Sequence, residues 1–217
     1  MNIELKNVTK IIHSITVIND VSASLNSGKV YGLCGYNGCG KTMLLRLLAG
    51  LILPTTGTIS IDGRILGKDI SFPPSIGILI ENPAFIDRYS GKRNLQLLAD
   101  IKSIIGTREI EVALSDVGLN PSDSKKYKKY SLGMKQRLGI AAAIMESPEL
   151  ILLDEPTNAL DANGIEEITE IVCRERSRGA LIVIASHDKD FLQTVSDTIY
   201  QIDAGQISSI TEKEGRG

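Results

Sequence analysis

The sequence predicts an α/β fold with a parallel central sheet, a small antiparallel sheet near the N-terminus and an inserted helical lobe. ELILLDE and ALIVIASH are nearly continuous apolar runs, which is typical of parallel strands covered by helices on both faces. Between Phe85 and Met145 strand-like runs are replaced by helical spacing. We therefore expect one domain of 217 residues, with an α/β core and β subdomain at about 1–84 and 146–217 and a helical subdomain at about 85–145.

The first third of the chain contains most of the predicted strands. IELKNVT and VSASLN alternate weakly, and KVYGLCG is a buried-type strand that enters a glycine loop. Lys41 to Leu51 has leucines on several faces, which indicates a buried helix. TGTISIDGRIL contains an Asp62-Gly63 turn and predicts an antiparallel hairpin. Ser75 to Ile80 is a further buried strand, which Pro83 ends.

Helical spacing accounts for the remaining segments. It appears in NLQLLADI, REIEVALSDVG and GMKQRLGIAAAIM, and again in an amphipathic stretch from Asn163 to Arg176. The last residues, EKEGRG, are expected to fray.

Composition excludes several classes of protein. A hydrophobic fraction of 42% against 23% charged residues supports a packed core rather than disorder. The net charge of −2 gives no electrostatic footprint for nucleic acid. No apolar run approaches the roughly 18 residues that span a bilayer, and MNIELKNVTK lacks a signal-peptide core. Three cysteines at no metal-ligand spacing fit a reduced, cytoplasmic protein.

A phosphate-binding loop stands out between a predicted strand and a predicted helix. Its residues match G-x-x-x-x-G-K-[ST], the pattern of P-loop nucleoside triphosphatases. Glycines let successive backbone N–H groups point at phosphate oxygens, and the helix N-terminus adds its positive end. Lys41 is expected to reach the β- and γ-phosphates of ATP, and the Thr42 hydroxyl to bind Mg²⁺. The loop comprises Gly35, Tyr36, Asn37, Gly38, Cys39, Gly40, Lys41 and Thr42.

Two acidic residues end the apolar run ELILLDE. In α/β sheets, ligands bind at the C-terminal ends of the strands, which is where Asp154 and Glu155 fall. We expect Asp154 to be a carboxylate of the Mg²⁺ site and Glu155 to polarise the water that attacks the γ-phosphate.

Over essentially its whole length the sequence resembles the ATP-binding cassette family. The phosphate loop, YSLGMKQRL, LLDEPTNALD and ASHD occur in the family's order and spacing. The resemblance implies a RecA-like P-loop core, and it implies that Ser131 and Gly133 of YSLGM cap the ATP held by a second subunit. It also places Asn158 to Asp161 at the subunit interface, although Asp161 is equally suited to cap the following helix. It makes His187 the γ-phosphate contact.

Two positions depart from the family pattern. Glu81 stands where a glutamine contacts Mg²⁺, and ILIENPAF with SLGMKQRLGIA resembles the ATPases of bacitracin-resistance and lantibiotic-immunity exporters, in which glutamate is usual. A carboxylate there is still a possible Mg²⁺ ligand, but it adds negative charge beside Glu155. Ile12 stands where an aromatic residue stacks on adenine. It offers apolar contact without stacking, so we expect looser base recognition.

The resemblance implies the motor of a membrane exporter for a peptide or drug. The expected partners are a second ATP-binding subunit, in a homodimer, and separate transmembrane permease subunits at the inner face of the cell membrane. The alternatives are a soluble cassette ATPase acting on ribosomes or DNA, and a nucleotide-binding regulator that does not hydrolyse ATP. Lys125 to Tyr130 is a basic run with two tyrosines. We interpret it as a solvated face and expect no nucleic-acid partner.

Overall fold

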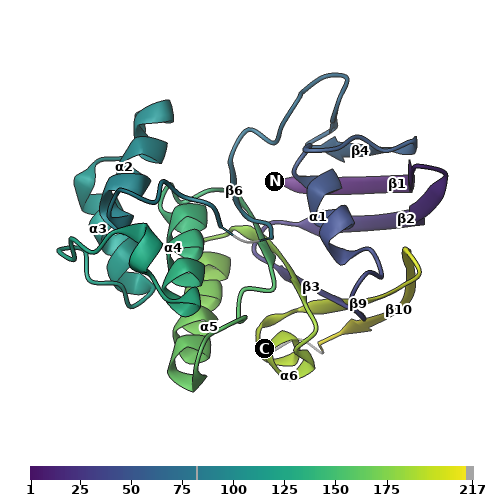
Figure 1. The fold of residues 1–217 in the computed structure, drawn as a ribbon. Coiled ribbons are helices and arrows are strands. Elements are labelled where there is room, and N and C mark those ends of the chain that lie inside the picture. The colour runs from purple at the N-terminus through teal and green to yellow at the C-terminus, as the bar shows by residue number, and fades with distance from the viewer. Residues whose placement is uncertain (82, 214–217) are drawn as a thin grey trace.

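The computed structural model describes residues 1–81 and 83–213, and these residues form two sheets with helices around them (Figure 1). The four-stranded sheet has the order β2-β1-β4-β5, and all its pairs are antiparallel. Its strands are β1 (Asn2–Ile12), β2 (Ile15–Asn26), β4 (Thr56–Ile61) and β5 (Arg64–Ile65). The predicted N-terminal strands and the hairpin around Asp62-Gly63 are therefore confirmed.

The six-stranded sheet has the order β10-β9-β3-β8-β7-β6 and is parallel except for β10. Strands β7 and β8 are fully buried and are the two runs predicted to be parallel, and the fully buried β3 is the predicted strand that enters the glycine loop. The C-terminal hairpin of β9 and β10 was not predicted from the sequence; its turn holds Ala204 and Gly205 at φ 46° and 78°. The bounds are β3 Val30–Cys34, β6 Ile76–Leu79, β7 Leu150–Asp154, β8 Leu181–Ser186, β9 Thr198–Asp203 and β10 Gln206–Glu212.

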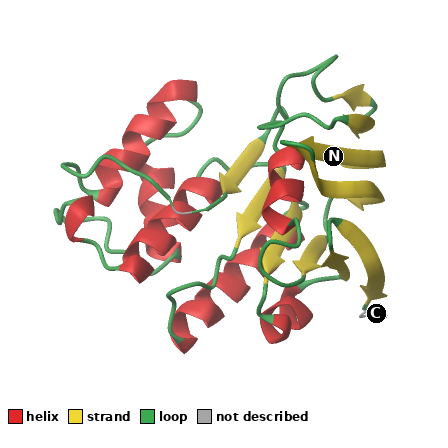
Figure 2. Cartoon of the chain, turned by 45° about the vertical axis from the view of Figure 1, so that its right-hand side comes forward, coloured by secondary structure: helices red, strands yellow, loops and turns green. Residues whose placement is uncertain are grey.

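The helices gather on two sides of this sheet (Figure 2). All the expected helices are present, and α2, α3 and α4 begin and end inside the 85–145 segment. The first helix ends at Leu48 instead of Leu51, because Gly50 adopts a φ of 71° and the N–H of Leu51 bonds back to Arg46. The helices are α1 (Lys41–Leu48), α2 (Gly91–Lys102), α3 (Thr107–Asp116), α4 (Leu132–Ile144), α5 (Ala162–Ser177) and α6 (Lys189–Val195).

Two apolar cores lie on the two faces of the parallel sheet. Along β7, Leu150 and Leu152 face the core that contains α1 and the antiparallel sheet. Ile151 and Leu153 face the core that contains α2 to α6. This alternation is the two-residue period of a strand covered on both sides, and it confirms the predicted α/β class.

The register of the parallel strands brings their C-terminal ends to one edge. Cys34 of β3 is opposite Ser186 of β8, and Asp154 of β7 is opposite Ala185 of β8. The segments that follow these three strands therefore lie close together. In the described part of the chain, no helix is long and apolar enough to cross a membrane. Glu212 and Lys213 are ordered as the end and flank of β10, whereas the rest of the EKEGRG stretch lies outside the described residues.

Candidate functional site

The phosphate loop connects β3 to α1 and depends on its glycines. Gly38 and Gly40 have φ values of 86° and 116°, which favour glycine. A side chain on Gly35 would place its Cβ 2.4 Å from the carbonyl oxygen of Ile202 in β9. The loop therefore needs glycine at Gly38 and Gly40 for backbone conformation and at Gly35 for close packing.

The start of α1 leaves backbone donors available for an anion. Among the hydrogen bonds of the described residues, none is donated by the backbone N–H of Gly38, Gly40, Lys41 or Thr42. These residues line a cleft of about 350 Å³. Free N–H groups at a helix N-terminus are suited to phosphate oxygens, so the loop fits a nucleotide phosphate chain. The other lining residues are Val17, Asn37, Met43, Asp154 and Glu155.

Lys41 extends across this loop toward Glu155. Its Nζ donates to the carbonyl oxygens of Gly35 and Tyr36 at 2.7 and 3.3 Å, and it lies 3.9 Å from Glu155 Oε1. Only 6% of the side chain is exposed. The ammonium group is thus held at the mouth of the loop beside the carboxylate that the sequence marks as catalytic.

Thr42 and Asp154 form the hard-oxygen part of the site. The Thr42 hydroxyl donates to Asp154 Oδ2 at 2.8 Å, although the two residues are 112 positions apart. Burial raises the pKa of Asp154 above its usual value, and the neighbouring Glu155 charge adds to this, while the hydrogen bonds from Thr42 and the Glu81 backbone oppose it. Hydroxyl and carboxylate oxygens are the ligands that Mg²⁺ prefers, so this pair fits that ion.

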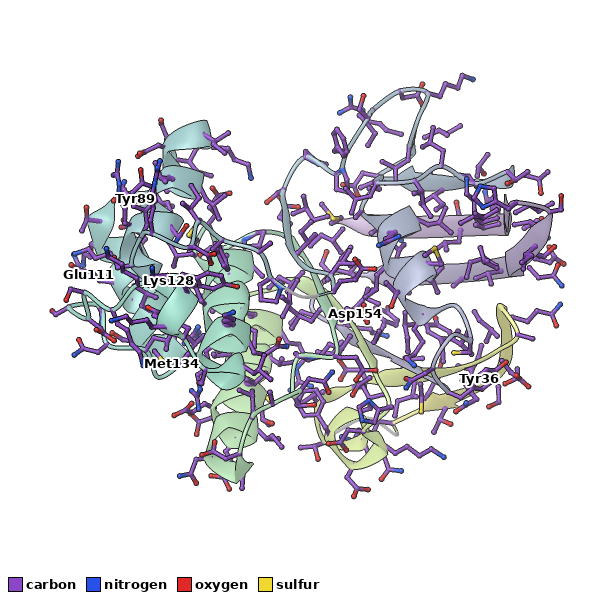
Figure 3. The ribbon with its side chains drawn as sticks, in the orientation of Figure 1. Tyr36, Tyr89, Glu111, Lys128, Met134 and Asp154 are labelled. Atoms are coloured by element: carbon purple, nitrogen blue, oxygen red, sulfur yellow. The ribbon has the colours of Figure 1, made fainter. Side chains whose placement is uncertain are left out.

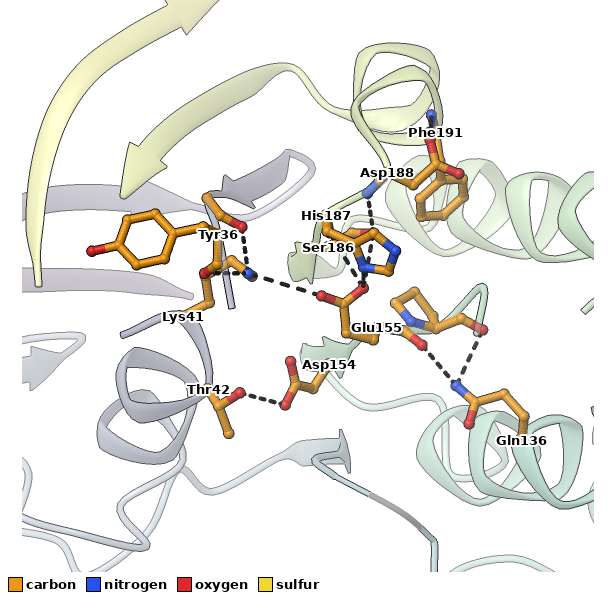
Figure 4. A network of polar contacts seen from close by, with 12 residues as sticks. Tyr36, Lys41, Thr42, Gln136, Asp154, Glu155, Ser186, His187, Asp188 and Phe191 are labelled. Atoms are coloured by element: carbon orange, nitrogen blue, oxygen red, sulfur yellow. Dashed lines mark hydrogen bonds and ion pairs between the residues drawn. The ribbon is translucent and has the colours of Figure 1, made fainter. Parts of the chain in front are cut away.

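Glu155 and His187 are in direct contact at the ends of β7 and β8 (Figure 4). His187 Nδ1 lies 2.8 Å from Glu155 Oε2, so a ring protonated at Nδ1 donates to the carboxylate. The Ser186 hydroxyl and the His187 backbone N–H both lie 3.3 Å from the same oxygen. Glu155 itself adopts a φ of 48°, an uncommon conformation for a residue with a side chain. The backbone turn aims its carboxylate toward Lys41 and His187.

The structure places two other predicted residues differently. Glu81 lines a second cleft, of about 470 Å³, together with Asp154 and Glu155, but its carboxylate pairs with Arg46 of α1 at 2.5 Å. Ile12 ends β1 and is not among the residues lining the phosphate-loop cleft, where the hairpin instead contributes Val17. The predicted contacts of Glu81 with Mg²⁺ and of Ile12 with the base stay predictions.

Ser131 and Gly133 are remote from the phosphate loop of the same chain. The Ser131 hydroxyl caps α4 by accepting from the Met134 N–H at 3.2 Å. A Cβ on Gly133 would lie 2.8 Å from the Ala159 carbonyl oxygen. In Figure 3, Met134 and Tyr36 lie on opposite sides of Asp154. One chain therefore does not bring YSLGM to its own loop.

Three contributors to the site were missed from the sequence. Gln136 of α4 donates to the carbonyl oxygens of Glu155 and Pro156 at 2.9 and 3.2 Å. The Gly205 N–H donates to the carbonyl of Cys39 at 2.8 Å and so supports the loop from the β9–β10 turn. Arg46 is the third. Gln136 lies within the motif YSLGMKQRL, and this position in the motif is the signal that could have located it. Asp161 caps α5 as expected, accepting from the Gly164 N–H at 3.0 Å.

These features define a P-loop nucleoside triphosphatase, and comparison with known proteins identifies the family. The family model described as ABC transporter matches residues 18–158. The chain belongs to the ABC transporter family and is an ATP-binding ATPase domain of it.

Three bacterial relatives match nearly all of this chain. An uncharacterized ABC transporter ATP-binding protein of Bacillus subtilis (strain 168), YybJ, is 46% identical and covers 95% of each chain. The bacitracin transport ATP-binding protein BcrA of Enterococcus faecalis is 40% identical over 94% of this chain and 67% of its own length. The lantibiotic transport ATP-binding protein SrtF of Streptococcus pyogenes is 38% identical over 99% of this chain and 92% of its own length.

Solved structures share the fold. The dimeric structure of MJ0796, a bacterial ABC transporter cassette, matches with a TM-score of 0.89 and 25% identity, covering 98% of this chain and 99% of that one. A dimeric post-hydrolysis state of MJ0796, bound to ADP and phosphate, matches with a TM-score of 0.88 and 23% identity over the same shares of the two chains.

Proposed function

We propose that this chain is the ATP-hydrolysing motor of a bacterial exporter for peptides or drugs. The observation that carries the proposal is the network at the ends of β3, β7 and β8. There Lys41 and His187 both approach Glu155, while Thr42 bonds Asp154. These groups have the chemistry that phosphoryl transfer to water requires.

Each part of the network has a proposed role in nucleotide binding. The free amides of Gly38, Gly40, Lys41 and Thr42, together with the Lys41 ammonium, hold the β- and γ-phosphates. Thr42 and Asp154 hold Mg²⁺, which when bound neutralises charge on the phosphates and on the leaving group. The base meets apolar side chains of the β1–β2 hairpin, Ile12 and Val17, without a stacked aromatic ring.

Hydrolysis is assigned to Glu155 and His187. Glu155 orients a water molecule and accepts its proton as the water oxygen bonds to the γ-phosphorus. The bond from that phosphorus to the bridging oxygen breaks, and ADP leaves. His187 holds the Glu155 carboxylate through Nδ1, and we assign to it the γ-phosphate contact that the family resemblance implies.

The partner in this reaction is a second copy of the chain. Ser131 and Gly133 lie at the exposed start of α4, away from their own phosphate loop. A two-fold pair of chains would bring each YSLGM segment to the other chain's ATP. The dimeric assembly of the MJ0796 cassette supports this arrangement.

Transport is proposed from the relatives' names. BcrA and SrtF are ATP-binding proteins of bacitracin and lantibiotic transport, so we propose separate permease subunits and a position at the inner face of the cell membrane. Co-purification of the tagged chain from membranes should recover a polytopic membrane protein, and its absence would contradict the transport role.

The motor itself is tested by Glu155→Gln. The amide keeps the size of the side chain but cannot accept the proton, so turnover should fall by about 10²–10⁴-fold while ATP binding persists. With ATP and Mg²⁺, the variant should accumulate as a closed dimer in light scattering.

The matched control is Glu170→Gln, which removes the same charge from an exposed position on α5. It should hydrolyse ATP like the parent and show no nucleotide-stabilised dimer. A monomeric Glu155→Gln protein in saturating ATP and Mg²⁺ would refute the two-chain arrangement.

A further inference from the structure

Glu81 has a positively charged partner that the sequence motifs do not reveal. Arg46 Nη2 lies 2.5 Å from Glu81 Oε1, and the two side chains are 29% and 60% exposed. Arg46 follows Thr42 by four residues in α1, so both side chains lie on the same face of that helix, one turn apart. The Glu81 carboxylate therefore binds one turn beyond the Thr42–Asp154 pair.

Glu81 nevertheless belongs to the site. Glu81 lines the cleft of about 470 Å³ together with Gln136, Asp154, Glu155 and Asn158. The residue thus lies beside Asp154 and Glu155 at this cleft, while its carboxylate contacts Arg46.

Negative charge is already crowded at this point. Asp154 and Glu155 are adjacent in the chain and line the same cleft as Glu81. A third free carboxylate would increase this repulsion. Lys41 is 3.9 Å from Glu155 and donates to the loop carbonyls, so Arg46 is the cation that the structure pairs with Glu81.

We propose that Arg46 is a positioning residue that holds the Glu81 carboxylate out of the Thr42–Asp154 cation site and so sets how much Glu81 adds to divalent-cation binding. The proposal rests on the proposed function, because it assumes that Thr42 and Asp154 hold Mg²⁺ with the nucleotide. Arg46 and the cation compete for one carboxylate. Removing the Arg46–Glu81 ion pair should therefore increase the affinity of the site for the divalent cation.

The test measures binding of ATPγS to the full chain by calorimetry, once in excess Mg²⁺ and once in EDTA. The ratio of the two affinities is the Mg²⁺-dependent gain. Arg46→Met removes the charge and keeps an unbranched apolar side chain. It should increase the gain by about twofold to fivefold, as expected for the loss of a partly exposed ion pair. Arg46→Lys should leave the gain nearer that of the parent.

The same substitution is then made together with Glu81→Gln. In that background Arg46→Met should leave the gain unchanged, because no carboxylate is left to release. An equal effect of Arg46→Met with and without Glu81→Gln would overturn the proposal, since Arg46 would then act through general charge or packing. Arg64→Ala is the matched control, because it removes the same charge on β5, away from both clefts.

Failure of the cation site and failure of the positioning role of Arg46 give different results. A parent protein that binds ATPγS equally in Mg²⁺ and in EDTA would overturn the cation site at Thr42 and Asp154, and Arg46's role with it. If the parent shows the Mg²⁺-dependent gain in ATPγS affinity and Arg46→Met leaves that gain unchanged, only the positioning role is overturned, and the proposed ATPase is left intact.

Discussion

Asp154 carries its charge in surroundings that disfavour it. It is only 8% exposed, and burial is the first cause of its raised pKa. Thr42 accounts for one stabilising hydrogen bond at 2.8 Å. A buried carboxylate that is only partly compensated lowers the stability of the folded chain at neutral pH, and a bound cation would offset this cost.

Asp154→Asn is therefore expected to raise thermal stability at pH 7. The pKa of Asp154 in the folded state lies above its unfolded value, so folding favours the protonated form. The destabilisation therefore grows as the pH rises from the unfolded pKa to the folded pKa. Below the ordinary aspartate pKa both states are protonated, and the advantage of asparagine should disappear. Circular-dichroism melts of parent and variant at pH 7 and at about pH 3, below the ordinary aspartate pKa, measure this.

Asp203→Asn is the control for this experiment, because Asp203 is exposed at the end of β9. Its melting temperature should follow the parent at both pH values. A gain from Asp154→Asn that is equal at pH 7 and at about pH 3 would show that the charge of Asp154 is not the cause.

The helix α4 ties the helical part of the chain to the catalytic strand end. Leu138, Gly139, Ile140 and Ala141 are buried, as expected for a helix that is apolar on most sides. Gln136 is also buried, and it bonds the two consecutive carbonyls of Glu155 and Pro156. A displacement of α4 is thus transmitted to the backbone that carries the Glu155 carboxylate.

Gln136→Ala should lower kcat more than it raises KM for ATP. The variant leaves two carbonyls without their donor, at a cost of about 1–3 kcal/mol in stability, and it frees the backbone at Glu155. The phosphate loop is untouched, so nucleotide affinity should change little. Steady-state ATPase assays and urea unfolding separate the two effects.

Gln96→Ala in α2 provides the comparison, since among the described residues the Gln96 side chain bonds Asp100 and Thr107, near the surface. Its kcat should equal that of the parent. If Gln136→Ala lost ATP affinity in proportion to kcat, a role in positioning Glu155 would be excluded.

At the scale of the whole molecule, one apolar core joins the helical segment to the parallel sheet. It contains Leu95 of α2, Ile110 of α3 and Leu138 of α4 together with Ile151 and Ile184 of the strands. The predicted subdomain boundaries near residues 84 and 146 stay a prediction. The shared core argues that the two parts unfold together.

Leu138→Ala is expected to lower the stability of the entire chain. Leu138 is completely buried in this core, and removing such a side chain costs about 2–5 kcal/mol. Urea unfolding followed by circular dichroism and by the reactivity of Cys39, which is 1% exposed in the other core, should give one shifted transition for both signals. Leu51→Ala, at a half-exposed leucine, should shift it little.

Separate midpoints for the two signals would show that the segment at about 85–145 folds as an independent unit.

The sequence alone determined the features that depend on neighbouring residues. Apolar runs predicted β3, β7 and β8, and the spacing of Gly35, Gly40 and Lys41 predicted the phosphate loop, because chain periodicity and glycine conformation are local properties. It also predicted that Asp154 and Glu155 would meet this loop, since parallel strands end at one edge.

Only the tertiary structure decided which side chains form hydrogen bonds and ion pairs around the phosphate loop. The contacts of Arg46 with Glu81 and of Gln136 with Glu155 join residues 35 and 19 positions apart. The β9–β10 turn reaches Cys39 from the far end of the chain. Such contacts follow from how helices pack on the sheet. Glu81 shows the reason most clearly: its sequence position predicts a Mg²⁺ ligand, whereas the packing of α1 places a guanidinium within hydrogen-bond distance of the same carboxylate.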